Sequence, residues 1–345
     1  MLVKSKVNTV PDAIYINLPL FILGLFIIIR GSDLFLDNAV WIARVSGISQ
    51  VVIGATIVSF CTTLPELVSS TTAALKGTAD MAIGNAIGSI ICNTGLILGI
   101  VLFFTVARIK REIFLVKGTF MLGGILMALF LIWPSQSGAP LAIERNEGLA
   151  MLVFLAVFVV VNYYESLHTV DVEKKPVIED EPPDGVPVVT AREIVKRLSL
   201  FTGGAVAVGF GAYLLVEFGQ RLARDMGISE AVISLLFVAL GTSLPELFTG
   251  ISAIRKNAEA VSVGNIFGAN VLNIVLVVGA SSTISPLYPE DRWLTPLDIP
   301  IALGICTVAF VLGLVRGRVG RKTGLTLLGI YIAYLVSMVL LGRIG

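Results

Sequence analysis

Long apolar blocks alternate with short polar breaks along the whole chain. Most blocks reach the roughly 20 apolar residues that a helix needs to cross the hydrocarbon core of a bilayer. They lack the period-two alternation of a membrane β-barrel. The pattern therefore predicts an all-α polytopic membrane protein with ten transmembrane helices. The expected limits of these spans are 14–35, 50–75, 80–106, 113–134, 148–164, 198–219, 230–255, 260–284, 297–315 and 323–342.

Two of these spans carry the same polar interruption. "FCTTLPEL" occupies 60–67 and "LGTSLPEL" occupies 240–247, so each span holds a proline, two hydroxyls and a glutamate. Pro65 has no N–H, so the carbonyl of Cys61 loses its helical partner, and Pro245 interrupts the second span in the same way. Inside a bilayer a freed carbonyl needs another partner or a water-filled cavity. The motif predicts two kinked helices whose oxygen atoms line a polar site.

The two interruptions belong to an internal repeat. Glu66 and Glu246 are 180 residues apart, and "GNAIGSIICN" at 84–93 matches "GNIFGANVLN" at 264–273 at the same offset. Five spans separate equivalent points, and because five is odd the two copies must cross the membrane in opposite directions. This is the inverted-repeat plan of secondary transporters, whose ion sites lie near the middle of the membrane.

The repeat divides the chain into two halves joined by a charged linker. We expect a first five-helix repeat over 14–168 and a second, inverted five-helix repeat over 198–345. Between them, 169–197 is rich in charge and proline, which is typical of a solvated linker that leads into helix six.

Oxygen-bearing side chains gather around each glutamate. Thr62 and Thr63 lie one turn before Glu66, on the same face of the helix, and Thr242 and Ser243 stand likewise to Glu246. Hard cations prefer oxygen ligands, and Ca²⁺ takes about 6–8 of them. Two such surfaces that face each other supply that number. The second motif adds amide oxygens at Asn93 and Asn273, whereas Asn85 and Asn265 are expected to tie helices together.

Composition narrows the class of protein and its partners. Hydrophobic residues make up 56% of the chain and charged residues 14%, against about 25% charged in an ordinary soluble domain. The lipid bilayer is therefore the expected partner, while the net charge of +1 gives no sign of nucleic acid and no obligatory protein partner is evident. No serine–histidine or aspartyl pair suits an intramembrane enzyme, so we expect neither an enzyme nor a cofactor. Intramembrane carboxylates are costly and usually functional.

Basic residues indicate an orientation. They accumulate after spans three, five, seven and nine, and are thinner in the other loops. The positive-inside rule then places the 169–197 linker in the cytoplasm and both termini outside a multi-pass plasma-membrane protein. Asp33, Asp37 and Asp80 lie near span ends, where contact with headgroups or water is expected.

Taken together, the paired motifs resemble those of the cation/calcium exchanger superfamily, and above all its compact prokaryotic sodium/calcium exchangers. The resemblance covers nearly the whole chain. It implies alternating access, with spans one and six sliding as a gating pair against the rest; both are rich in glycine. It assigns the cation ligands to the carboxylates of Glu66 and Glu246, the hydroxyls of Thr62, Thr63, Thr242, Ser243 and Ser89, the carbonyls of Ser59 and Ala239, and the amides of Asn93 and Asn273.

Two positions depart from the family pattern. Sodium/calcium exchangers often carry aspartate where Asn273 stands and serine where Ala269 stands. Two carboxylates give a charge of −2, which one Ca²⁺ or two protons neutralise. Three Na⁺ would leave +1, and one charge moved is worth about 2.3 kcal/mol per 100 mV. We expect Ca²⁺ and Na⁺ as the transported ions. Proton/calcium antiport is the alternative within this class, and a cation channel is the alternative outside it.

Overall fold

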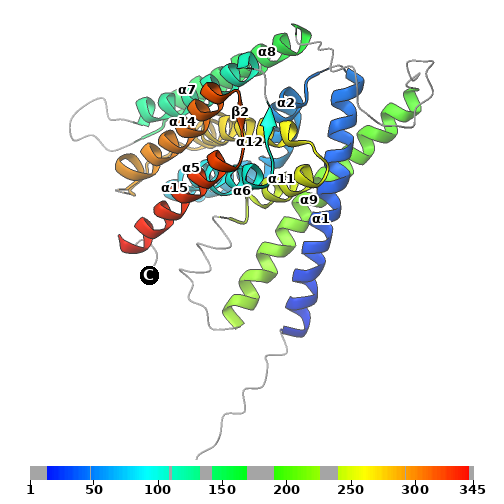
Figure 1. The fold of residues 1–345 in the computed structure, drawn as a ribbon. Helices are drawn as coiled ribbons and strands as arrows, with labels where there is room; N and C mark the ends of the chain where they lie inside the picture. The colour runs from blue at the N-terminus through cyan, green and yellow to red at the C-terminus, as the bar shows by residue number, and fades with distance from the viewer. Residues whose placement is uncertain are drawn as a thin grey trace, which may run out of the picture.

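The computed structural model describes residues 14–46, 48–108, 111–132, 142–168, 190–225, 240–291 and 293–341. Helices dominate these ranges, as Figure 1 shows, and two short strands complete the fold. The first half contains α1 (Ile14–Ser46), α2 (Gln50–Ile53), η1 (Gly54–Val58), α3 (Ser59–Thr62), α4 (Leu64–Leu75), α5 (Ala79–Cys92), η2 (Asn93–Ile97), α6 (Leu98–Phe104), β1 (Ala107–Arg108), α7 (Arg111–Ile132) and α8 (Arg145–His168), where η marks a π-helix.

The second half contains α9 (Ala191–Asp225), α11 (Leu244–Arg255), α12 (Glu259–Leu272), η4 (Asn273–Val278), α13 (Gly279–Ile284), η5 (Leu294–Asp298), α14 (Ile299–Arg316), β2 (Arg318–Val319) and α15 (Arg321–Leu340). The two strands pair antiparallel, with Ala107 opposite Val319 and Arg108 opposite Arg318.

The described residues contain eight helices that are long and apolar enough to cross a membrane, or nine if a bent pair is counted as one span. The bent pair is Gln50–Thr62 with Leu64–Leu75, and its two parts meet at 45°. Of the predicted span 230–255, only the part from 240 onward lies in the described residues, where it forms α11. The class of fold is therefore confirmed, while the count of ten spans stays a prediction.

Helices α1 and α9 are longer than their sequences predicted. They have 33 and 35 residues, or roughly 50 Å at 1.5 Å per residue, whereas the hydrocarbon core measures about 30 Å. The predicted limits 14–35 and 198–219 were too short because both helices continue beyond their apolar stretches. Near the predicted end of the α1 span, Asp33 accepts a hydrogen bond from Ser252 Oγ at 2.6 Å.

The contacts of Asp33 and Asp37 in α1 correct a second expectation, that these acids face only headgroups or water. Besides Ser252, Asp33 pairs with Arg255 at 3.3 Å, and Asp37 pairs with Lys256 at 2.6 Å. Both acids therefore hold the C-terminal half of α1 against the end of α11.

Glycines allow α1 and α9 to pack closely side by side (Figure 1). The pair runs antiparallel: Gly24 lies against Leu215 and Gly211, whereas Gly204 lies against Phe35. A Cβ at Gly204 would come within 2.6 Å of the Phe35 backbone nitrogen, which no packed side chain tolerates. The close approach thus requires glycine at this position.

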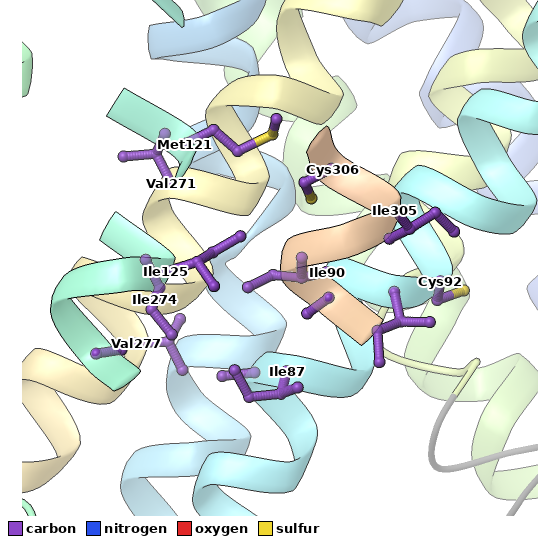
Figure 2. Close-up of a cluster of buried hydrophobic side chains, with 14 of the residues drawn as sticks. Ile87, Ile90, Cys92, Met121, Ile125, Val271, Ile274, Val277, Ile305 and Cys306 are labelled. Carbon is purple, nitrogen blue, oxygen red and sulfur yellow. The ribbon is translucent and has the colours of Figure 1, made fainter. Parts of the chain in front are cut away.

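The most buried helices are the two that follow the polar interruptions. The Glu259–Ile284 span is 94% buried and the Ala79–Phe104 span 72%, against 22% for Arg321–Leu340. Isoleucines and valines of α5, α12 and η4 pack with α7 and α14 in one apolar cluster, part of which is drawn in Figure 2. This core fixes the helices that carry the predicted ligands.

Secondary structure repeats at the same offset as the sequence. Helices α4 and α11 begin at Leu64 and Leu244, and the π-helices η2 and η4 begin at Asn93 and Asn273. Even the backbone turn between these helices recurs, with φ of 74° at Gly77 and 53° at Asn257. Asparagine is among the few residues other than glycine that adopt this left-handed conformation readily. The duplication is therefore visible in the backbone as well as in the residues.

The close approach of the second copy of the glycine motif lies in the described residues, whereas the equivalent partners of the first copy, residues 231 and 235, lie outside them. Gly264 and Gly268 of α12 bring the helix against the backbones of Val51 and Ala55, where a Cβ would lie 2.2–2.3 Å from a carbonyl oxygen. Gly84 and Gly88 of α5 meet no described atom within 4 Å of an added Cβ. The expected close helix approach is confirmed for the second copy of this motif only.

Candidate ion-binding site

Each predicted kink is a break between two helical segments. In the first half α3 ends at Thr62, Thr63 forms a turn, and α4 starts with Pro65 in its first turn. In the second half α11 starts with Pro245 in its first turn. There the Gly241 carbonyl accepts a hydrogen bond from Leu244 N at 3.4 Å, so it regains a partner one residue earlier than in a regular helix. This carbonyl therefore finds another partner, which is one of the two outcomes expected for it.

The two glutamates lie at the start of the helices that these breaks create. Glu66 and Glu246 are both fully buried, and each is in the first turn of its helix, where the dipole favours a carboxylate. Ser89 Oγ donates to Glu66 Oε1 at 3.5 Å. Two buried carboxylates require charge neutralisation, which a cation or protons would supply.

The site holds a concentration of buried polar atoms that lack partners. Of sixteen buried side-chain atoms without a hydrogen-bond partner in the described part of the chain, nine belong to predicted ligand residues. Leaving such a group unsatisfied costs about 1–3 kcal/mol. A hard cation would satisfy the oxygen atoms among them. The nine unpartnered atoms are Thr63 Oγ1, Glu66 Oε2, Ser243 Oγ, both carboxylate oxygens of Glu246, and the amide oxygen and nitrogen of Asn93 and of Asn273.

Two asparagines connect the halves of the molecule and orient their hydroxyls. Thr62 Oγ1 donates to Asn265 Oδ1 at 3.2 Å, and Thr242 Oγ1 donates to Asn85 Oδ1 at 3.1 Å. Asn85 Nδ2 in turn donates to Ser70 Oγ at 2.9 Å, which fixes its amide orientation. A hydroxyl coordinates a cation through its lone pairs, so its proton must point elsewhere. The asparagines tie helices together, as expected, and also supply the acceptors for these protons.

Asn93 and Asn273 occupy equivalent positions at a change of helical geometry. Both are fully buried, and each is the first residue of a π-helix, η2 or η4. Single π-helical turns inside α-helices are frequent at functional sites. The sequence analysis identified the two amides but not the π-helices around them.

The predicted carbonyl ligands have a mixed outcome. Ser59 O accepts a bond from Thr63 N at 2.9 Å, and Thr62 Oγ1, which donates to Asn265, lies 3.3 Å from it as an alternative donor. Ala239 lies outside the described residues. The remaining predicted ligands are present and buried, except Thr242, which is half-buried.

The two glutamates differ in their hydrogen bonds, in line with the departure from the family pattern at Ala269. Glu66 receives a hydrogen bond from Ser89, whereas both oxygens of Glu246 lack a partner among the described residues. Position 269 is equivalent to 89, and its alanine has no hydroxyl to donate. The second carboxylate is therefore the less satisfied of the two.

A polar cluster behind Asn93 escaped the sequence analysis. Asn270 Nδ2 donates to Thr94 Oγ1 at 2.6 Å, and Thr94 Oγ1 lies 3.4 Å from Cys306 Sγ. The cluster joins η2, α12 and α14 directly beside the two predicted amide ligands. Its only signal in the sequence is the proximity of Thr94 to Asn93 and of Asn270 to Asn273.

A cavity of about 250 Å³ adjoins the site. Cys92, the neighbour of Asn93, lines it together with Asp80, Asp291 and Asp298. Asp80 also accepts hydrogen bonds from the backbone N–H groups of Glu290 and Asp291 at 2.8 and 3.0 Å, in an exposed loop. Acidic walls attract cations toward the interior.

Comparison with known proteins identifies the family of the chain. The model of the sodium/calcium exchanger protein family matches residues 16–164 and again 196–340. The sodium/calcium exchanger MaX1 of Methanosarcina acetivorans is 29% identical over 94% of this chain and 99% of its own length. The inner membrane protein YrbG of Escherichia coli is 31% identical over 92% of this chain and 95% of its own.

Solved structures give the same result. A structure of the sodium-calcium exchanger NCX_Mj superposes with a TM-score of 0.78 and 26% identity, covering 94% of this chain and 98% of that one. The family match, the relatives and the fold all concern membrane transporters. The chain described here belongs to the sodium/calcium exchanger family.

Proposed function

We propose that this protein exchanges Ca²⁺ for Na⁺ across the membrane at the buried site between Glu66 and Glu246. The observation that carries the proposal is the set of orphaned oxygens on these carboxylates and on Thr63, Ser243, Asn93 and Asn273. They are hard ligands, and their number suits the 6–8 oxygens that Ca²⁺ takes. MaX1 and NCX_Mj are sodium/calcium exchangers, which supports the same choice of ions.

Alternating access by two inverted five-helix repeats, 14–168 and 198–345, is the proposed mechanism. The twofold match of the family model and the backbone repeat at 180 residues support the duplication. The pair α1 and α9 packs mainly on itself through glycines, which supports its movement as one body. The cavity lined by Asp80, Asp291 and Asp298 is the proposed route by which ions reach the site from one side.

Reconstituted transport tests this function directly. Purified protein in proteoliposomes is given an outward gradient of Na⁺, K⁺ or H⁺ as the only driving force, and ⁴⁵Ca²⁺ uptake is measured. We expect uptake with Na⁺ alone. Uptake that follows only the pH gradient would establish proton/calcium antiport, and rapid uptake without any opposing gradient would establish a channel.

The contacts between loops support the proposed sidedness. Strands β1 and β2 join the loops after spans three and nine, whereas Ile143 bridges to Leu287 and joins the loops after spans four and eight. Loops that follow odd-numbered spans thus contact one another, and so do loops that follow even-numbered spans. The basic residues of the loops after odd-numbered spans favour the cytoplasm for that face.

A cysteine in the linker tests this orientation. We expect Gly185→Cys, in a background without Cys61, Cys92 and Cys306, to resist impermeant thiol reagents in intact right-side-out vesicles and to react after permeabilisation. The linker is expected on the cytoplasmic face because of its basic residues. Position 185 lies outside the described residues, so the experiment relies on the sequence alone. Labelling of intact vesicles would reverse the proposed topology.

Restoring the missing hydroxyl tests the sodium ligands. We expect Ala269→Ser to lower the sodium concentration for half-maximal exchange several-fold, because the new hydroxyl replaces a water held at an entropic cost of up to about 2 kcal/mol. Ala302→Ser, at an equally buried alanine of α14, is the matched control. The measurement is ⁴⁵Ca²⁺ exchange across a sodium titration.

Asn273→Asp extends the same titration to two pH values. The added carboxyl titrates beside the two glutamates, so this variant should change the pH dependence of exchange more than its sodium dependence.

An unchanged sodium midpoint in Ala269→Ser, with normal folding, would remove position 269 from the site.

A further inference from the structure

A strongly basic pocket lies at the junction of α14 and α15, away from the ion site. This basic pocket has a volume of about 620 Å³ and is lined by Arg316, Arg318, Arg321, Lys322, Thr323 and the backbone of Gly320, with Val106 beside them. Four of these side chains are cationic and none is acidic. Figure 1 shows the pocket's frame, where β2 joins the end of α14 to the start of α15.

The local fold forces these cations together. Helix α14 ends at Arg316, and Gly317 turns the chain with a φ of +61°, a conformation that favours glycine. Pairing of β1 with β2 then places Arg108 directly opposite Arg318. Like charges held at such positions repel one another, so an anion would stabilise the arrangement.

Among the residues that the structure describes, no acidic side chain neutralises most of these charges. In the described ranges, Arg316, Arg318 and Lys322 take part in no ion pair, whereas other exposed arginines such as Arg197 and Arg221 pair with glutamates. Arg321 lies over the Phe103 ring at 4.6 Å, a contact with the face of its guanidinium that leaves the edge N–H groups available.

The start of α15 adds uncharged donors to the pocket. The helix runs for 20 residues, begins after Gly320, which has no side chain to cap it, and has no acidic residue in its first turn. Its first N–H groups therefore lack side-chain acceptors. Thr323 is only 1% exposed and lines the pocket, so its hydroxyl is a further candidate donor.

We propose that the basic pocket binds a phosphate group at the membrane surface. Guanidinium groups, helix N-terminal N–H groups and a hydroxyl are the donor set that holds phosphate oxygens. The pocket sits where two membrane-spanning helices end, which is the position of sites for anionic lipid headgroups. The phosphate is carried by an anionic phospholipid or is free in solution, and the two sources are separable by experiment. The site is independent of the transported ions.

Native mass spectrometry of the purified full-length protein measures this binding. The protein is titrated with phosphatidylglycerol, with phosphatidylcholine and with inorganic phosphate. The test variant is Arg318→Gln/Arg321→Gln/Lys322→Gln. The matched control removes the same charge from exposed cations outside the pocket, as Arg44→Gln/Arg192→Gln/Lys196→Gln. Thr323→Val removes only the buried hydroxyl, and Thr326→Val, at an exposed threonine one turn later, is its control.

We expect phosphatidylglycerol to bind more tightly than phosphatidylcholine. The test variant should lose at least about tenfold in this affinity, since each basic residue near the surface contributes a factor of about five. The control triple variant should stay within about twofold of wild type because its charges lie outside the pocket. Thr323→Val should weaken binding and Thr326→Val should not. Competition by inorganic phosphate at equal affinity would identify free phosphate as the ligand, and lack of competition a lipid headgroup.

Two results would overturn the proposal. One is an equal loss of phosphatidylglycerol affinity in the test and control triple variants, which would show general charge attraction. The other is wild-type protein that neither prefers phosphatidylglycerol nor binds phosphate. Thermal unfolding of every variant establishes that it is folded.

Discussion

Replacing either central glutamate should abolish calcium transport. In Glu66→Gln or Glu246→Gln, ⁴⁵Ca²⁺ uptake into proteoliposomes should fall at least about 100-fold. Removing one partner of a buried charge interaction costs about 3–5 kcal/mol, and each 1.4 kcal/mol is a factor of ten. Both carboxylates are fully buried, so water cannot replace the lost charge.

The unfolding temperature separates loss of the site from loss of the fold. Saturating Ca²⁺ should stabilise the wild-type protein, by about 2.7 kcal/mol at 100 times the dissociation constant, and should not stabilise the variants. Without Ca²⁺ the Glu246→Gln protein should be at least as stable as wild type, because both oxygens of this buried carboxylate lack partners in the described residues.

Glu259→Gln is the matched control for these variants. Glu259 begins α12, the helix that leads to Asn273, and is only half-buried. Its substitution should leave transport and Ca²⁺-dependent stabilisation unchanged. Calcium uptake near the wild-type rate in either central variant would exclude the proposed site.

The sequence predicted the parts of the site that depend on local chemistry. Pro65 must interrupt a helix wherever it stands in one, and the bend at this point is 45°. The register of 180 residues relates Glu66 to Glu246 without reference to packing, and the backbone follows the same register. Helix breaks and repeats are therefore readable from residues alone.

Features set by contacts between distant segments were not readable. The π-helices at Asn93 and Asn273 and the bonds from Thr62 to Asn265 and from Thr242 to Asn85 all depend on how the halves pack. Asp33 could not be assigned to Ser252, 219 residues away, from its own neighbourhood. The helix ends of α1 and α9 were missed for the same reason, since tertiary partners extend them past their apolar stretches.

Two adjacent glycines of α9 should respond in opposite ways to the same substitution. Gly204→Val should lower the unfolding temperature strongly and abolish exchange, whereas Gly203→Val should be tolerated. A Cβ at Gly204 meets the Phe35 backbone at 2.6–2.8 Å, and a Cβ at Gly203 meets nothing within 4 Å in the described structure. Overpacking costs about 1–3 kcal/mol when side chains yield, and backbone atoms of a paired helix yield less readily.

The comparison isolates the contact between α1 and α9 because both variants make the same change of residue in the same helix. If these helices move as one body during exchange, separating them at Gly204 disrupts the movement as well as the packing. The measurements are thermal unfolding and sodium-dependent ⁴⁵Ca²⁺ exchange at a temperature where both variants are folded. Exchange at the wild-type rate in folded Gly204→Val would show that close packing of α1 on α9 is not needed for transport. Equal loss in Gly203→Val would place the cause in α9 itself and not in its contact with α1.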